Sequence, residues 1–212
     1  MNSIQKQEKP RWVQLSAAII GNALEWYDFG VFAFLAVIIS QVFFPTAGEY
    51  TGLLLTLATF GVGFLMRPLG GIAIGLYADR RGRKAALQLI IALMTVSLLL
   101  MVFTPSYNTI GIAAPLLIVF ARLLQGLATG GEFASATAYL VEAAPEGKKG
   151  IYGAWQMFGQ GLANLCGALT GFLLTSIFTQ QELLDGMSRI PFVIALLIAP
   201  LSWWRRRHRA EP

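Results

Sequence analysis

The sequence predicts an all-α integral membrane protein with six transmembrane helices, and three observations support this fold class. First, 56% of the 212 residues are hydrophobic and only 13% are charged, whereas a soluble domain has about 25% charged residues. Second, the apolar residues form long runs without the period-two alternation of a membrane barrel strand. Third, the basic residues gather between alternate runs, as the positive-inside rule requires for six crossings.

The six predicted helices form one bundle with short connections. A span needs about 20 residues, so the chain has room for six. They are expected at about 13–44, 51–78, 85–103, 110–141, 151–178 and 190–204, after an N-terminal segment, 1–12, and before a basic tail, 205–212.

Most of the 16 Lys and Arg residues fall on one side of the membrane in this arrangement. They lie in the N-terminal segment, in the loops after the second and fourth spans, and in the tail. The opposite loops contain only Arg189. We therefore expect both termini in the cytoplasm and a multi-pass protein of the plasma (inner) membrane. This positive-inside distribution accounts for the net charge of +5 without a nucleic-acid partner. Binding of anionic lipid by the basic tail is the alternative.

The single Cys and single His restrict the chemistry of the chain. One Cys excludes an internal disulfide framework and a thiolate metal cluster. His208 lies in the Arg-rich tail, so a buried His-based catalytic pair is excluded as well. We expect no metal, no cofactor and no enzyme activity, and an intramembrane hydrolase is rejected for this reason.

The first span carries two acidic residues, Glu25 and Asp28. It is too long and too interrupted for a cleaved signal peptide, so we expect a retained helix that is tilted or bent. Two carboxylates this close in a low dielectric repel each other, so one should hold a proton near neutral pH unless a cation neutralises it. This pattern favours proton binding coupled to solute movement. The alternatives are a position near the membrane surface or permanent pairing with Arg.

The fourth span places Arg122, Gln125, Thr129 and Glu132 on one helical stripe. A guanidinium stays charged and binds carboxylates with two parallel hydrogen bonds. Arg122 therefore suits either an anionic solute or a neighbouring acid in the first span. Arg67, in the second span beside Pro68, suits a solute carboxylate too, or lies near the cytoplasmic end without meeting the solute.

The fifth span repeats a polar residue every fourth position, at Tyr152, Gln156, Gln160 and Asn164. We expect this stripe to face the interior and to offer hydrogen bonds to a solute. Alternatively, the amides only bridge helices.

Glycines four residues apart predict close contacts between helices, because small residues let helix backbones approach each other. They occur in the second, fourth and fifth spans, as Gly71–Gly75, Gly126–Gly130 and Gly167–Gly171.

The loop between the second and third spans contains the stretch "GLYADRRGRKAAL". Its glycines and charged residues are Gly75, Asp79, Arg80, Gly82, Arg83 and Lys84, in this order. This order resembles the loop signature of the major facilitator superfamily, and Arg122-x2-Gln125-Gly126 resembles its fourth-helix signature. The stretches "GNALEWYDF", "GFLMRPLGG", "RLLQGLATGGE" and "KKGIYGAWQ" narrow the resemblance to the metabolite:proton symporters, which carry citrate, 2-oxoglutarate, shikimate, proline and betaine.

This resemblance implies solute uptake coupled to proton entry by alternating access. It assigns the loop residues, with Asp79 and Arg83 foremost, to a cytoplasmic gate. Glu142 is a candidate partner in that gate, and Arg122 matches the proton-coupling helix. The stretch "PSYNTIGIAAPLLIVFARLLQG" looks most like the citrate and tricarballylate members, while a proline or betaine carrier is the alternative.

The family is about twice as long as this chain, because it has two six-helix halves with the solute between them. We therefore expect an N-terminal half or truncated form, equivalent to half of a twelve-helix fold. Its partners would be a solute, protons, lipid and either a second half or a second copy in a homodimer. The stretch "DGMSRIPF" lacks the family's usual Gly-Trp beside the Arg. A non-transporting subunit or remnant is the competing hypothesis.

Overall fold

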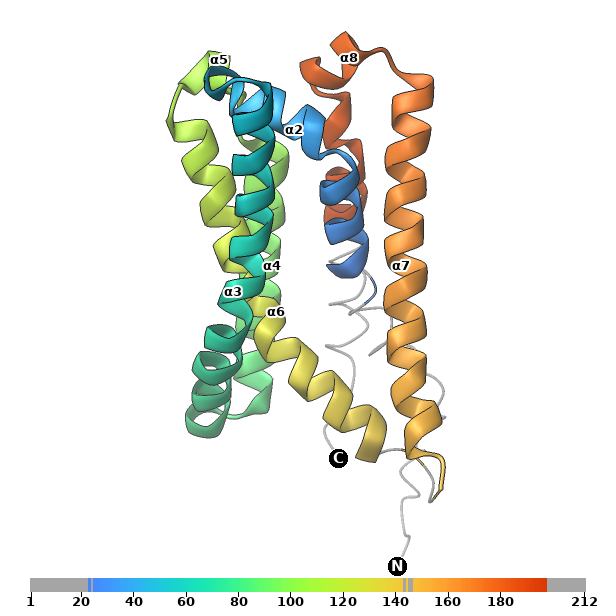
Figure 1. Cartoon of the computed structure of the whole chain (residues 1–212). Helices are drawn as coiled ribbons and strands as arrows, with labels where there is room; N and C mark the ends of the chain where they lie inside the picture. The colour runs from blue at the N-terminus through green and yellow to red at the C-terminus, as the bar shows by residue number, and fades with distance from the viewer. Residues whose placement is uncertain (1–22, 24, 143, 145–146, 198–212) are drawn as a thin grey trace, which may run out of the picture.

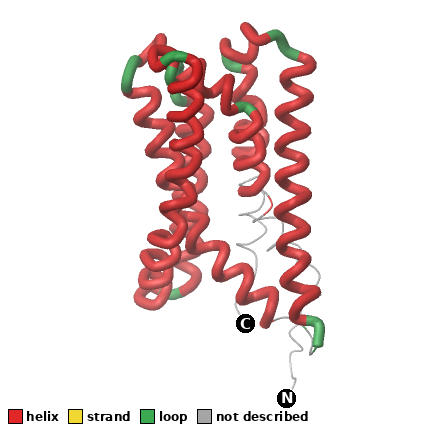
Figure 2. Tube along the Cα trace, viewed as in Figure 1, coloured by secondary structure: helices red, strands yellow, loops and turns green. Residues whose placement is uncertain are grey.

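The computed structural model describes residues 23, 25–142, 144 and 147–197, and these are helical apart from short connections (Figure 1 and Figure 2). The predicted all-helical class is confirmed for this part of the chain. The segment 1–12, the beginning of the first predicted span, the end of the sixth and the tail 205–212 lie outside the described residues.

The first apolar helix is sharply bent. Its two parts, Glu25–Phe34 and α2 (Ala36–Phe43), meet at 73°. Leu35 between them has φ −88° and ψ 11°, away from helical values of about −63° and −42°. The short helix η1 (Pro45–Ala47) follows and ends at Gly48. The bend places α2 across one end of the molecule in Figure 1.

Three long helices lie side by side, α3 (Glu49–Arg81), α4 (Arg83–Phe103) and α6 (Ala113–Glu142), and a fourth, α7 (Lys149–Ile177), lies on the other side of the first helix (Figure 1). At about 1.5 Å per residue, each is at least as long as a hydrocarbon core of about 30 Å. The turn between α3 and α4 is Gly82, whose φ of 87° is a conformation that favours glycine.

Short elements close the end of the molecule opposite that turn (Figure 1). They are α5 (Tyr107–Ile110), α8 (Gln180–Asp185) and η2 (Met187–Arg189), the last of which begins an apolar helix to Leu197. Arg189 donates hydrogen bonds to the carbonyl oxygens of Val102 and Thr104, at 3.2 and 2.7 Å. It thereby supplies hydrogen-bond donors to carbonyl groups at the C-terminal end of α4, where a cation is also favourable.

Helix α8 begins with a capping box. The Thr179 hydroxyl accepts a hydrogen bond from the Glu182 amide, and the Glu182 carboxylate accepts one from the Thr179 amide. That backbone hydrogen bond, together with one from the Thr179 hydroxyl, lowers the pKa of Glu182 below its ordinary value. The box fixes where the chain turns after α7.

Three described helices are long and apolar enough to cross a membrane: Glu49–Arg81, Ala113–Glu132 and Lys149–Ile177. The bent pair Glu25–Phe34 and Ala36–Phe43 raises the number to four if it is one span. Gln88–Phe103 and Met187–Leu197 are apolar but shorter. The predicted count of six is therefore not reached within the described residues.

Helices α3 and α6 touch backbone to backbone through glycines. A methyl group added at Gly126 would collide with the carbonyl oxygen of Gly63, and one added at Gly130 with that of Arg67. Gly70 meets the backbone of Leu127 in the same way. This contact fixes Arg67 on α3 against the polar stripe of α6.

Helix α7 packs against the first helix by the same means. A methyl group at Gly167 would lie 2.5 Å from the Tyr27 carbonyl oxygen, and one at Gly171 would strike the Phe34 ring. The Tyr27 hydroxyl donates to Thr170 across this contact at 3.2 Å. By contrast, added atoms at Gly75 meet nothing within 4 Å, so the close contact predicted there is wrong among the described residues.

The bundle is apolar outside and partly polar inside. Large hydrophobic side chains on its surface include Leu54, Leu65, Ile72, Leu116, Phe120, Leu165 and Ile177. Buried polar side chains include Glu25, Asp28, Arg122, Gln125, Thr129, Glu132, Gln156 and Gln160. Because ionisable groups in a membrane helix are costly unless they face a partner or a cavity, the polar interior is the part of the molecule to examine for function.

Candidate functional site

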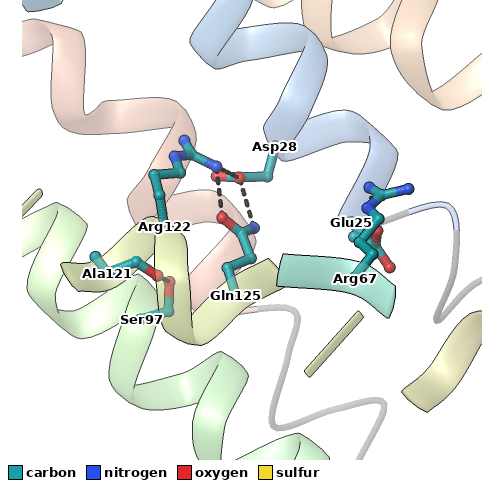
Figure 3. Close-up of polar contacts among 7 residues, drawn as sticks. All are labelled: Glu25, Asp28, Arg67, Ser97, Ala121, Arg122 and Gln125. Carbon is teal, nitrogen blue, oxygen red and sulfur yellow. Dashed lines mark hydrogen bonds and ion pairs between the residues drawn. The ribbon is translucent and has the colours of Figure 1, made fainter. Parts of the chain in front are cut away.

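Arg122, Asp28 and Gln125 form a closed hydrogen-bonded cluster between α6 and the first helix (Figure 3). One guanidinium nitrogen of Arg122, Nη1, donates to Asp28 Oδ2 at 2.6 Å and to Gln125 Oε1 at 2.5 Å. Gln125 Nε2 donates to the same Asp28 oxygen at 2.7 Å. Arg122 and Gln125 reach one carboxylate together because residues three apart share a helix face. The second of the two interpretations of Arg122, pairing with an acid of the first span, is the arrangement present.

This cluster is fully enclosed. The exposed fraction is 0% for Arg122 and 2% for Asp28. The face of Phe32 covers the guanidinium at 4.0 Å from Arg122 Cζ to the ring centroid. Arg122 Nε and Nη2 and Asp28 Oδ1 have no hydrogen-bond partner in the described part of the chain. The ion pair is therefore compensated in charge but not saturated in hydrogen bonds.

A second ion pair lies one helical turn away on the first helix, between Glu25 and Arg67 of α3 (Figure 3). Arg67 Nη2 donates to Glu25 Oε1 at 2.9 Å. Pro68, inside α3, has no amide proton to donate to the preceding turn. Arg67 is placed beside an acid of the first helix. Whether it meets the solute or lies near the cytoplasmic gate without meeting it stays a prediction.

Three aromatic rings surround the Arg67 guanidinium, and we call them the Arg67 cage. The distances from Arg67 Cζ to the ring centroids are 4.4 Å for Phe64, 4.8 Å for Phe29 and 5.1 Å for Trp26. Each lies within the roughly 6 Å at which a ring face attracts a cation. The cage stabilises the charge of Arg67 independently of Glu25.

Phe29 connects the two ion pairs. Its ring lies 4.8 Å from Arg67 Cζ and 5.7 Å from Arg122 Cζ. It also packs edge-on against Phe60. Because Glu25, Phe29 and Asp28 belong to one helical turn, a displacement of this helix changes both pairs together.

Thr129 and Glu132 continue the stripe of α6 and are both buried, as the helical spacing predicted. Glu132 is also one of the charges that act on Glu25. The interior therefore holds three carboxylates, Glu25, Asp28 and Glu132, and two guanidinium groups, Arg67 and Arg122.

On α7, Gln156 and Gln160 are buried, while Tyr152 and Asn164 are half-buried. The four residues lie on the inward side of α7, and Asn164 contacts the first helix, since a methyl group at Gly30 would lie 2.9 Å from the Asn164 carbonyl oxygen. Whether this stripe offers hydrogen bonds to a solute stays a prediction.

The predicted gate residues lie at the α3–α4 turn, remote from both ion pairs along α3. Asp79 and Arg80 are exposed there, as are Gly75 and the turn residue Gly82. The side chains of Arg83, Lys84 and Glu142 are outside the described set, so the gate stays a prediction.

The aromatic rings in contact with the Arg67 and Arg122 guanidinium groups were not predicted from the sequence. Trp26 and Phe29 each follow an acid in "EWYDF", Phe32 lies one turn further on the first helix, and Phe64 lies one turn before Arg67 on α3. For Arg67 the available signal was Phe64, three residues before it on the same helix face. The ring over Arg122, Phe32, belongs to the first helix and gave no such signal.

The known proteins to which this chain is similar are transporters. A family model described as sugar (and other) transporter matches residues 13–206. The chain is 42% identical over 191 residues to a citrate-proton symporter of Klebsiella pneumoniae, covering 90% of this chain and 43% of that protein. It is 40% identical over 197 residues to a proline/betaine transporter of Escherichia coli, covering 93% and 39%. It is 38% identical to an alpha-ketoglutarate permease of the same species, covering 90% and 44%.

Solved structures support the fold alone. The partially occluded, inward-open xylose transporter of Escherichia coli matches with a TM-score of 0.80 at 18% identity, over 94% of this chain and 50% of that one. The chain thus spans less than half the length of the curated relatives above, and half the length of this solved transporter.

Proposed function

Because the chain belongs to the sugar (and other) transporter family, within the major facilitator superfamily that its motifs resemble, we propose that it forms part of a proton-coupled carrier of a small organic solute. The proposed mechanism is symport by alternating access. Its family and its named relatives are membrane transporters. Six spans, cytoplasmic termini and a plasma (inner) membrane location belong to the proposal.

The observation that carries this function is the pair of buried ion pairs on one turn of the first helix. Each joins a carboxylate to a guanidinium on a neighbouring helix, Asp28 to Arg122 and Glu25 to Arg67. Protonation of either acid removes one charge and leaves its Arg uncompensated, which is costly in a low dielectric. A proton therefore changes the free energy of the contact between the first helix and α3 or α6, as coupling requires.

We propose an organic carboxylate as the solute, with citrate or a related di- or tricarboxylate first. The buried guanidinium group of Arg122 and the partly buried one of Arg67 suit carboxylates, and the citrate-proton symporter is a relative at 42% identity. A proline or betaine solute is the second candidate, favoured by the 40% identity to a proline/betaine transporter. All three solutes carry a carboxylate.

A second bundle is part of the proposal, because the chain matches only 43% of the citrate-proton symporter. In this superfamily the solute lies between two halves. A homodimer is the alternative way to cover the polar interior. A non-transporting subunit or remnant is the competing function.

The test is uptake by vesicles that contain this chain together with the part of the Klebsiella pneumoniae symporter that it does not match. We call this assembly the reconstituted carrier. An imposed pH gradient, acid outside, should drive accumulation of radiolabelled citrate or proline. Collapse of the gradient with a protonophore should leave only exchange across the membrane.

Two variants sharpen the test. Asp28→Asn removes a charge of the enclosed cluster and should abolish or strongly reduce accumulation. Asp185→Asn, on the short helix α8, is a matched control that should transport normally. If neither solute accumulates although both parts are inserted, the transport function is contradicted and the non-transporting subunit becomes the better hypothesis.

A further inference from the structure

We propose that Arg67 and Trp26 form the subsite for a carboxylate group of the solute, and that the Glu25 carboxylate occupies this subsite until a proton neutralises it. This inference rests on the proposed function, which it deepens by assigning separate roles to the two ion pairs. The Glu25 carboxylate then binds Arg67 whenever the solute carboxylate is absent.

The Glu25–Arg67 pair is the exchangeable one of the two. Asp28 Oδ2 accepts hydrogen bonds from two donors, Arg122 and Gln125, and the Arg122 side chain is 0% exposed. Glu25 accepts one hydrogen bond within the described part of the chain, from Arg67, and the Arg67 side chain is 18% exposed. A solute can therefore approach Arg67 without opening the α6 cluster, whereas Arg122 is closed on all sides.

Hydrogen-bond donors around Arg67 are available for a carboxylate. Arg67 Nε and Trp26 Nε1 are buried and have no acceptor in the described part of the chain. The Trp26 ring centroid lies 5.1 Å from Arg67 Cζ, so both donors belong to the same small region. Buried donors without acceptors are costly, and a carboxylate with two oxygens satisfies a guanidinium and one neighbouring donor together.

The Arg67 cage explains why Arg67 keeps its position when Glu25 is neutral. Phe64, Phe29 and Trp26 hold the guanidinium by cation–π contacts at 4.4 to 5.1 Å. These contacts persist when the carboxylate partner loses its charge. The cage thus presents a fixed cation to an incoming anion, which preorganises the subsite.

The exchange conserves charge. Before it, Arg67 is positive and Glu25 negative. One proton then adds to a Glu25 oxygen, and Oε2 has no partner in the described residues. One negative solute carboxylate takes the place of Glu25 on Arg67. Because proton and carboxylate enter together, the subsite stays neutral, and neither is favourable alone in the low-dielectric interior.

The groups that face Glu25 are consistent with this role. Arg67 faces it from α3, Glu132 and Thr129 from α6, and Asp28 from its own helix. Among these charged groups only Arg67 favours the ionised form of Glu25, whereas the two acids oppose it. When a solute carboxylate replaces Glu25 at Arg67, Glu25 loses the group that stabilises its negative charge. It must therefore bind a proton for the exchange to be favourable.

The first test is the pH dependence of solute binding to the reconstituted carrier, measured with radiolabelled citrate in equilibrium dialysis. In the wild type, binding should weaken by about tenfold per pH unit where Glu25 releases its proton. Glu25→Gln mimics the protonated acid, so its binding should lose this dependence and match the tightest wild-type binding. Ionisation of citrate itself is common to both proteins, so the ratio of their dissociation constants isolates the protein's proton.

The second test isolates the Trp26 donor. Trp26→Phe keeps an aromatic face for Arg67 but removes the indole N–H. We expect citrate binding to weaken by about tenfold, the loss typical of a hydrogen bond to a charged group. Trp155→Phe, the same substitution at an exposed tryptophan of α7, should bind citrate normally. Equal affinity of the two variants would remove Trp26 from the subsite.

The outcomes separate this inference from the function on which it rests. If Glu25→Gln keeps the wild-type pH dependence while Asp28→Asn loses it, the exchange at Glu25 is refuted and proton-coupled transport still stands. If the wild-type carrier accumulates no solute in a pH gradient, the proposed function itself fails. Loss of citrate binding in Glu25→Gln at every pH, with the variant properly inserted, would also overturn the exchange.

Discussion

Replacement of Arg122 by Gln should strongly destabilise the bundle. Asp28 is 2% exposed and accepts from Arg122 at 2.6 Å. Removing one partner of a buried ion pair costs about 3–5 kcal/mol, because the other charge stays buried and uncompensated. In a protein of this size, each kcal/mol of unfolding free energy changes the melting temperature by about 2–4 °C. The expected fall in melting temperature is therefore about 6–20 °C. Gln125, which still donates to Asp28 at 2.7 Å, favours the lower half of that range.

The assay is thermal unfolding of the purified protein in detergent, for the wild type, Arg122→Gln, Asp28→Asn and the double variant. The double variant carries no buried uncompensated charge, so it should melt above Arg122→Gln. Strictly additive effects in the double variant would refute the argument from an isolated buried charge.

Three further expectations concern packing and the ends of the helices. Gly126→Leu should lower the melting temperature by several degrees, because overpacking costs about 1–3 kcal/mol and the added atoms meet the Gly63 backbone; Gly161→Leu, whose added atoms meet nothing within 4 Å, should not. Arg189→Gln should destabilise the protein, since the carbonyls of Val102 and Thr104 lose their donor; an unchanged melting temperature would contradict this role. The lowered pKa of Glu182 means that its stabilising effect is complete above its ordinary pKa of 4.5 and disappears as the pH falls through the lowered value. The melting temperatures of the wild type and Glu182→Gln should therefore differ above pH 4.5 and converge in more acidic buffer.

The polar interior was predictable because helical spacing is a local property. Arg122 and Gln125 are three residues apart, and so are Glu25 and Asp28. Such spacing fixes a shared helix face whatever the neighbours are. Since embedded charges face inward, burial of these residues followed from the sequence.

The pairing of acids with cations was not predictable in the same way. Either Arg67 or Arg122 was a possible partner for either acid, and the sequence left both roles of Arg122 open. The choice depends on the depth and rotation at which α3 and α6 meet the first helix. Those are set by contacts at Gly63 and Gly70 that the spacing of Gly71–Gly75 did not reveal, since glycine is frequent in membrane helices with or without a close neighbour.

The two carboxylate–guanidinium pairs on the first helix differ in how far they are buried, and this difference suits them to different roles. Asp28 and Arg122 are closed within Phe32 and Gln125, so a change in their charge acts mainly on the contact between the first helix and α6. In the other pair the Glu25 side chain is 0% exposed but that of Arg67 is 18% exposed, so a solute can contact this pair through Arg67. Phe29 touches both guanidinium groups and belongs to the rigid turn that carries both acids. In the proposed exchange, occupation of the Glu25–Arg67 pair would be transmitted to the Asp28–Arg122 pair by displacement of this single helix, which is the minimum that coupling between solute binding and a change of conformation requires.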